Sequence, residues 1–354
     1  MRAEPVPSRL VEREGDLARI DGALARARDG RGVLMVVEGP AGVGKTSLLA
    51  DARAVADATG MRVLRSRGAE LEREFAFGVV RQLVEPALRG MDDPAELFRG
   101  PAGVAAGLLG LPGAPERTGA SFADQDSSFA VLHGLYWLCA DLAERRPLCV
   151  IVDDAHWADT PSLRFLGFLV PRLEELPVAL VVAARPAEAR EEAAVLEALA
   201  ADPAAEAIAP APLTPAGVSE LVEAELGEAP DAAFAEACHR ATGGLPFLVR
   251  QLVTRLREDG VAPTAAAAPL VGRFGGSAVG RWTLVRLGRL PPAAGQLARA
   301  LAVLEAADLA RAAALAGLDP DEAADAADAL AAVAILAPGR PLAFAHPMVR
   351  ESSP

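Results

Sequence analysis

Short apolar runs that alternate with amphipathic stretches are the feature that most constrains how this chain folds. The runs are rich in β-branched residues, as in strands buried on both faces, and the stretches between them have a helical period. We predict strands at Val33–Val37, Arg62–Leu64, Leu148–Val152, Val178–Ala183 and near Ala207–Ala209. Helices are expected at Thr46–Thr59, Phe77–Leu88, Phe129–Arg145, Ser162–Leu176 and Ala187–Ala201. The alternation predicts an α/β domain with a parallel sheet covered on both faces.

The pattern of apolar residues changes after Pro210, where strand-like runs are replaced by helical ones. Thr214-Pro215 is typical of a helix start, and Gly243-Gly244 ends a helix that runs from about Asp231. Pro246 opens the next helix. From Arg281 onward we expect three or four Ala/Leu helices and then a β-hairpin at APGRPLAFAHP, an order that suggests a small winged-helix domain.

These boundaries divide the chain into five predicted parts. They are an N-terminal segment with a helix (1–30), a P-loop-type α/β domain (31–212), an all-α domain (213–261), a linker (262–280) and a winged-helix-like domain (281–354). Many Gly and Pro residues interrupt the alternation of strands and helices at 90–121. There we expect an irregular surface insertion of low order that carries one short helix. The linker is predicted from its Ala/Gly/Pro composition.

Composition narrows the class of protein further. A hydrophobic fraction of 52% excludes a disordered chain, and the net charge of −13 argues against non-specific attraction to nucleic acid or an anionic membrane. Three cysteines without CxxC spacing fit a reducing cytosol. No apolar run reaches the roughly 18–20 residues that span a bilayer, and the first residues lack a signal-peptide core. We therefore expect a cytoplasmic protein with no membrane partner.

The single lysine of the chain, Lys45, lies in a complete GxxxxGK[ST] motif, although Lys and Arg together number 35. The motif follows a predicted strand and opens a predicted helix, so that its backbone N–H groups and the helix N-terminus meet a phosphate. A compact ammonium fits between such amides better than a guanidinium does. A glycine-rich structural turn is the alternative. The predicted phosphate-binding residues are Gly39, Pro40, Ala41, Gly42, Val43, Gly44, Lys45, Thr46 and Ser47.

A second acidic element ends the strand of LCVIVDD, which we expect to lie beside the strand that precedes the motif. Asp153 would bind Mg²⁺ together with the Thr46 hydroxyl, directly or through water, and Asp154 would orient or deprotonate an attacking water. The alternative is an Asp pair that caps a turn. His156 is expected to have a structural or hydrogen-bonding role, and Trp157 to pack.

Arg185 follows the strand Val178–Ala183, at the carboxyl edge of the sheet where ligands bind in such folds. Its guanidinium would sense or stabilise a γ-phosphate. An exposed or N-capping arginine before Pro186 is the alternative reading of the same position.

Together these segments resemble the STAND branch of AAA+-like P-loop ATPases, and more narrowly the ATPase module of the large ATP-binding LuxR-type regulators of actinobacteria. The resemblance rests on LVERE, EGPAGVGKTSLL, ELEREFAFGVVRQL, HGLYWL, LCVIVDDAHWADTPSLRFL, VVAARP, CHRATGGLPFLVRQL and FAHPMVR. The DDAHWAD and ATGGLPF blocks in this order are the most specific of them. Glu12 departs from the family, whose corresponding block reads GRE, and this puts adenine recognition or the path of the N-terminal loop in question.

The resemblance implies a switch that binds ATP or ADP with Mg²⁺, opens or self-associates with ATP and an unknown inducer, and hydrolyses ATP slowly. It implies that Lys45 and Thr46 bind phosphate and Mg²⁺. It also implies that Asp153 and Asp154 form the Walker B pair of acidic residues and that Arg185 is the sensor arginine. It also places Pro246 of the GxP motif on adenine and His346 near the ADP β-phosphate, where a core or hairpin histidine is equally consistent. The family's helical repeats and DNA-reading helix-turn-helix would lie outside residues 1–354.

Two other functions remain open. Asp154 is shorter than the glutamate common in fast AAA+ ATPases, which allows a nucleotide-binding scaffold that never hydrolyses. Direct DNA binding through residues 281–354 is disfavoured, because that segment holds seven arginines against eight acidic residues, a net of −1. A metabolic kinase is disfavoured because nothing in the sequence suggests a second substrate pocket or a lid.

Overall fold

The computed structural model describes residues 10–91, 93–109, 125–185, 191–272, 287–288, 290–304, 306–332, 335–336 and 341–344. The chain divides into two compact units. The sheet unit comprises Gly15–Glu38 and Thr46–Ala209. The helical unit comprises Met1–Glu14, Gly39–Lys45 and Pro210–Pro354, so that the predicted phosphate loop belongs to it.

Five parallel strands form the centre of the sheet unit: β1 (Val33–Glu38), β2 (Arg62–Arg67), β3 (Leu148–Asp153), β4 (Val178–Ala184) and β5 (Ala205–Ile208). Their order is β2-β3-β4-β1-β5. Every residue of β3 and β4 is buried, as the continuous apolar runs predict for strands covered on both faces. The predicted parallel α/β fold is therefore confirmed.

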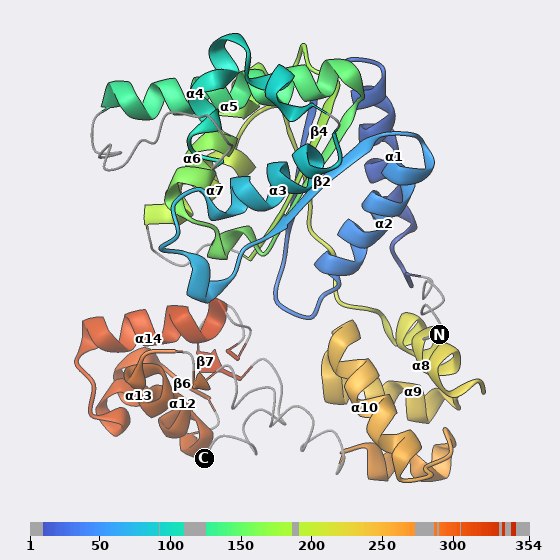
Figure 1. The fold of residues 1–354 in the computed structure, drawn as a ribbon. Helices are drawn as coiled ribbons and strands as arrows, with labels where there is room; N and C mark the ends of the chain where they lie inside the picture. The colour runs from blue at the N-terminus through green and yellow to red at the C-terminus, as the bar shows by residue number, and fades with distance from the viewer. Residues whose placement is uncertain are drawn as a thin grey trace. The chain divides into compact units, whose positions relative to one another are not determined.

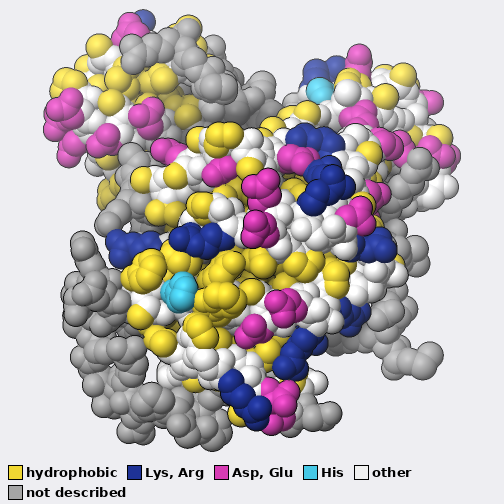
Figure 2. Space-filling view, turned by 90° about the horizontal axis from the view of Figure 1, so that it is seen from above, with side chains coloured by type: hydrophobic (Ala, Val, Ile, Leu, Met, Phe, Trp, Pro, Cys, Tyr) yellow, Lys and Arg dark blue, Asp and Glu magenta, His cyan; other side chains and the backbone are white. Residues whose placement is uncertain are grey.

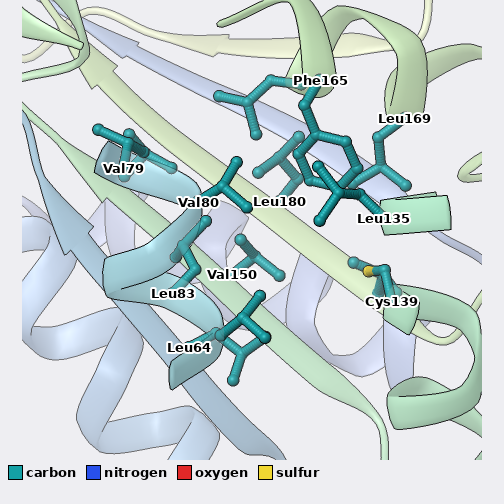
Figure 3. Packing of buried hydrophobic residues seen from close by; sticks show 14 of the residues in the cluster. Leu64, Val79, Val80, Leu83, Leu135, Cys139, Val150, Phe165, Leu169 and Leu180 are labelled. Atoms are coloured by element: carbon teal, nitrogen blue, oxygen red, sulfur yellow. The ribbon is translucent and has the colours of Figure 1, made fainter. Parts of the chain in front are cut away.

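Helices cover both faces of this sheet. Figure 1 shows α1 (Glu14–Arg28) and α2 (Lys45–Ala58) on one side, and α3 (Gly78–Arg89), α5 (Gln125–Arg145), α6 (Thr160–Leu169) and α7 (Glu191–Ala200) on the other. Figure 3 shows the second interface, where Leu64, Val150 and Leu180 of the strands meet Leu83, Leu135 and Phe165 of the helices. Among the described residues no helix is long and apolar enough to cross a membrane.

Two helical predictions in the sheet unit need correction. The helix expected over Ser162–Leu176 ends at Leu169 and continues as a 3-10 turn over Val170–Arg172, because Pro171 has no N–H to donate. The insertion expected at 90–121 is not of low order over 94–109, where short helical turns (Pro94–Phe98, Gly100–Ala102 and α4, Gly103–Ala106) pack on α5. Gly134 permits this approach, since a Cβ there would lie 3.2 Å from the Ala105 nitrogen. Residues 110–121 lie outside the described residues.

Aromatic side chains cluster on the outer surface of α5 and α6. Phe129 and Trp137 are 56% and 39% exposed, and the ring of His133 stacks on Phe129 at 5.9 Å. The Trp137 indole N–H donates to His133 Nε2 over 3.1 Å, and Phe168 packs edge-on against Phe129. Figure 2 shows hydrophobic side chains gathered around a histidine on this face.

In the helical unit, α8 (Pro215–Leu226) and α10 (Pro246–Glu258) begin where predicted, and α9 (Ala232–Thr242) begins and ends as predicted. The Thr214 hydroxyl caps α8 by accepting from the Gly217 N–H, and Gly243 ends α9 with a left-handed φ of 60°. The predicted linker needs correction over its described part. Residues 265–267 form a 3-10 turn tied to Asp231, and Val271 is fully buried against the same helices.

The last segment contains α12 (Pro292–Leu304), β6 (Ala306–Ala307), α13 (Leu309–Ala316), α14 (Pro320–Ala332) and β7 (Leu342–Ala343). Strand β7 pairs antiparallel with β6, and Leu336 pairs antiparallel with Phe344 across the predicted hairpin. The tip of that hairpin and His346 lie outside the described residues.

All three cysteines are buried and unpaired. Burial raises the pKa of Cys139, Cys149 and Cys238 to about 12 in each case. They therefore pack as small apolar side chains, in agreement with the sequence.

Candidate nucleotide-binding site

The predicted phosphate loop connects β1 to α2 and is curled around its own lysine. Lys45 is 6% exposed, and its ammonium donates to the carbonyls of Gly39 (2.7 Å) and Pro40 (3.1 Å). Gly42 and Gly44 adopt φ values of 87° and 110°, which disfavour any residue with a side chain. The loop thus has the backbone curvature that a phosphate cradle requires. Ser47 follows in the first turn of α2 and is exposed.

Arg13 braces this loop, a role that sequence reasoning missed. Its side chain is 4% exposed, and its guanidinium donates to the carbonyls of Glu12 (2.9 Å), Val43 (3.1 Å) and Ala211 (2.5 Å). One planar donor group thereby ties the N-terminal segment, the loop and the chain before α8 together. The RE dipeptide of LVERE was the available signal, but no local pattern names its carbonyl partners.

The start of α10 contacts the loop from another side. The Phe247 N–H donates to the Gly42 carbonyl over 3.2 Å, and Pro246 is the first residue of the helix. Gly244 has a φ of 69°, and a Cβ there would overlap the Leu213 carbonyl. The second glycine of ATGGLPF is therefore required by the backbone. Packing of Pro246 on adenine stays a prediction.

Glu12, which departs from the family pattern, adopts the left-handed backbone that a glycine there would favour, with a φ of 54°. Its carboxylate accepts hydrogen bonds from the Thr214 N–H (2.8 Å) and the Thr214 hydroxyl. Burial raises the pKa of Glu12, but the hydrogen bonds from Thr214 and Gly217 and the nearby Arg13 outweigh it, so that the pKa is lowered. Glu12 therefore acts as a polar anchor for the start of α8.

The predicted metal ligands meet in the sheet unit. The Thr46 hydroxyl donates to Asp153 Oδ2 over 2.9 Å, and Asp153 is 8% exposed at the end of β3. The expectation that the acidic strand lies beside β1 was wrong, because β4 lies between β1 and β3. The contact still forms, since α2 carries Thr46 from the end of β1 to Asp153.

Asp154 lies one residue beyond β3 with φ 48° and ψ 43°, and its N–H donates to Asp153 Oδ1 over 2.9 Å. Arg67, the last residue of β2, holds the Asp154 carboxylate with Nε at 3.0 Å and Nη2 at 2.7 Å. The ion pair with Asp154 raises the pKa of Arg67. The sequence did not indicate this partner, because β2 and β3 pair over a separation of 87 residues.

Arg185 follows β4, the strand between β1 and β3. Its Nε is buried, and within the described part of the chain it has no hydrogen-bond partner. A buried donor without a partner at the carboxyl edge of the sheet fits a bound anion.

The motif after β3 is largely structural. Asp159 is 2% exposed and accepts from the N–H groups of Phe77 (2.7 Å), Val79 (3.1 Å) and Ser162 (2.9 Å). It caps α6 and also holds the start of α3, where Phe77 has a φ of 59°. The rings of His156 and Trp157 lie 5.2 Å apart, in agreement with packing.

The donor set fits Mg²⁺ held together with a nucleotide. Among the described residues there is no group of three or more His, Cys, Asp or Glu that would hold a metal alone. One carboxylate and one hydroxyl leave the remaining positions to phosphate oxygens and water, the usual arrangement of Mg²⁺ in such sites.

The fold and these residues are similar to those of ATPase-like P-loop modules. Residues 9–182 match the family of the AAA ATPase domain, which implies nucleotide binding with Mg²⁺ typical. The chain is also similar to the Walker-type ATPase of Pyrococcus abyssi, with 14% identity, a TM-score of 0.64 and coverage of 99% of this chain and 98% of the other. The ORC2 protein of Aeropyrum pernix, solved in ADPNP–ADP complexes, matches with 13% identity, a TM-score of 0.59 and coverage of 99% and 95%.

An uncharacterized protein of Rhizobium meliloti (strain 1021) is 26% identical over 274 residues, 69% of this chain. The chain spans about a quarter of that relative's length, since the match covers 24% of it.

Proposed function

We propose that the chain is an ATP/ADP-binding switch with slow Mg²⁺-dependent hydrolysis, and that it is the regulatory module of a signal-responsive transcriptional regulator of the STAND type, related to the LuxR family. The observation that carries the nucleotide part is the completed motif: a curled loop with a buried lysine, followed by a threonine that contacts the acid of β3. The regulator part is supported by the resemblance of DDAHWAD and ATGGLPF.

In this proposal Lys45 exchanges its two carbonyl partners for phosphate oxygens, while the loop amides and the N-terminus of α2 bind the same oxygens. Thr46 and Asp153 hold Mg²⁺, which neutralises phosphate charge when bound. Asp154 orients water, and Arg185 offers the terminal phosphate its Nε, which has no hydrogen-bond partner among the described residues. Arg67 holds Asp154 by an ion pair, and this contact is consistent with slow turnover.

The winged-helix assignment of residues 281–354 is also a proposal. The order α12-β6-α13-α14 followed by β7 and an antiparallel arm supports it. With a net charge of −1, this segment is proposed to serve the switch without binding DNA. A cytoplasmic location and self-association with ATP belong to the same proposal.

The test compares ATP binding with Mg²⁺ in the wild type and in Lys45→Ala. We expect loss of about a hundredfold in affinity, because several charge-assisted hydrogen bonds to phosphate disappear. Arg31→Ala, which removes an exposed cation outside the loop, is the control. Equal ATP affinity in the wild type and Lys45→Ala would sink the proposal.

Measurement of phosphate release distinguishes the hydrolysing switch from a nucleotide-binding scaffold that does not hydrolyse ATP. If Asp154→Ala and the wild type release phosphate at the same background rate, the chain binds nucleotide without hydrolysing it. A salt-sensitive shift of duplex DNA by the chain would instead favour direct DNA binding.

A further inference from the structure

A groove of about 420 Å³ lies in the sheet unit between α2 and the ends of β2 and β3. Its apolar lining comes from Leu49, Ala50 and Ile151, and its polar rim includes Arg53, Arg65 and Arg67. We call it the α2–β2 groove. Its volume is within the range of about 300–1,000 Å³ typical of small-molecule sites and is far larger than a lone phosphate needs.

The strand register explains why the charges meet. Arg65 pairs with Ile151 and Arg67 with Asp153, so that the two arginines lie on the same face of the sheet. Arg53 extends from α2 and contacts Asp57 at 3.6 Å, while Arg67 contacts Asp154. The Arg65 side chain makes no hydrogen bond or ion pair within the part of the chain that the structure describes. Three guanidinium groups around one apolar hollow are unexpected in a chain of net charge −13.

A second hollow of about 390 Å³ shares Arg53 and Arg65 with the groove. Its other lining includes Asp57 and the apolar residues Val63, Leu64 and Leu83. Arg53 and Arg65 therefore lie between two hollows along β2, each of which has apolar residues in its lining. A ligand that fits this pattern has an anionic group for the guanidinium forks and an apolar body for the hollows on either side.

From these observations we infer that the α2–β2 groove is a second ligand site, for a small organic molecule that carries a phosphate or a carboxylate. Thr46 and Asp153 also line the groove, so that such a ligand would meet the proposed metal-binding group. Its role as an effector of the switch rests on the proposed function. Binding in the groove does not, because it depends on Arg53, Arg65 and the apolar lining.

Three probes of similar size test the chemistry: phenyl phosphate, benzoate and the neutral benzyl alcohol, titrated into the full chain by ligand-observed NMR. We expect at least one anionic probe to bind about tenfold more tightly than benzyl alcohol, as charge-assisted hydrogen bonds require. Whichever anion binds more tightly identifies the head group. Equal binding of all three probes, or binding of none, overturns the inference.

Two variants locate the site without touching Thr46, Asp153, Asp154 or Arg67. R53Q/R65Q removes two of the three guanidinium charges of the groove, and A50F fills the groove while all charges stay. Each is expected to weaken the anionic probe about tenfold. R240Q, which breaks a comparable exposed i,i+4 pair, and A54F on the same helix serve as controls and should stay within about twofold. Unchanged binding in both groove variants contradicts the site.

Lys45→Ala separates this inference from the proposed function. Loss of ATP binding with the anionic probe retained supports a distinct site. Loss of both, with the fold intact by circular dichroism, shows that the groove is only the end of the nucleotide site and overturns the inference.

Discussion

The predicted phosphate loop and the proposed metal-binding group, which comprises Thr46, Asp153 and Asp154, keep their shapes by different means. The loop offers carbonyls, which accept from its own Lys45 at Gly39 and Pro40 and from two distant donors, Arg13 at Val43 and Phe247 at Gly42. The metal-binding group offers carboxylates, and Thr46 and Arg67 donate to Asp153 and Asp154.

This difference predicts how each region tolerates change. A loop held through its carbonyls depends partly on donors far away in the sequence, so that some of its weak points lie outside its own motif. A group held through carboxylates depends on its own side chains, and changes there alter chemistry more than folding. The following predictions test this contrast, from the largest expected effect to the smallest.

Arg13→Ala is expected to cause the largest loss of stability. One buried and two partly buried carbonyls lose a charged donor, which lowers the free energy of unfolding by about 3 kcal/mol. Urea unfolding followed by circular dichroism measures it, with Arg240→Ala as the exposed control. ATP affinity should fall in parallel. A stability equal to that of the control would show that the loop does not need this brace.

Asp153→Asn is expected to leave the fold intact. The factor by which Mg²⁺ strengthens ATP binding should fall by about tenfold or more, because the loss of a residue that supports a metal site typically weakens metal affinity by that much. Titration of ATP with Mg²⁺ and with EDTA measures the difference. Asp154→Asn is the matched control on the next residue and should keep the Mg²⁺ dependence while slowing phosphate release. If both variants respond alike to EDTA, the roles assigned to the two carboxylates are wrong.

Arg67→Gln is expected to change chemistry with little change in stability. The Arg67 side chain is 68% exposed, so that losing its ion pair costs only about 0.5 kcal/mol. Release of the Asp154 carboxylate should speed phosphate release. Multiple-turnover phosphate assays measure the rate of release, and thermal melts measure the change in stability. An unchanged rate would mean that the pair does not restrain Asp154.

Glu12→Gln is expected to have the smallest effect, and one that depends on pH. Because the folded-state pKa of Glu12 lies below its ordinary value of 4.5, the charged form stabilises the fold above that pH. This contribution is lost as the pH falls through the folded-state pKa. The wild type should exceed the variant by about 1 kcal/mol at pH 7, and the gap should close at lower pH. A gap that is constant with pH contradicts the assignment.

The sequence predicted the parts of the site that are local. Gly42, Gly44 and Lys45 follow from one motif, and Asp153 follows from an apolar strand that ends in acid. The parallel sheet follows from the alternation of buried runs and helices. Each of these predictions depends on neighbours within about one strand or one turn of helix, where periodicity and spacing carry the information.

Contacts between distant segments could not be predicted. The insertion of β4 between β1 and β3 depends on which strands pair, and an apolar run does not encode its neighbour. Arg13 reaches Ala211 across 198 positions, and nothing in the RE dipeptide indicates that carbonyl. The burial of residues 94–109 was missed because their glycines and prolines suggested a loop, although the apolar residues between them pack on α5.

The buried lysine has a consequence for chemical labelling. Lys45 carries the only side-chain amine of the chain, so that acylating reagents directed at lysine report on a single position. At 6% exposure and with two carbonyl partners, that amine should acylate slowly in the free protein and at a different rate once a phosphate replaces those partners. Peptide mass spectrometry of one acylated lysine would then serve as a footprint of nucleotide occupancy, without any engineered reporter.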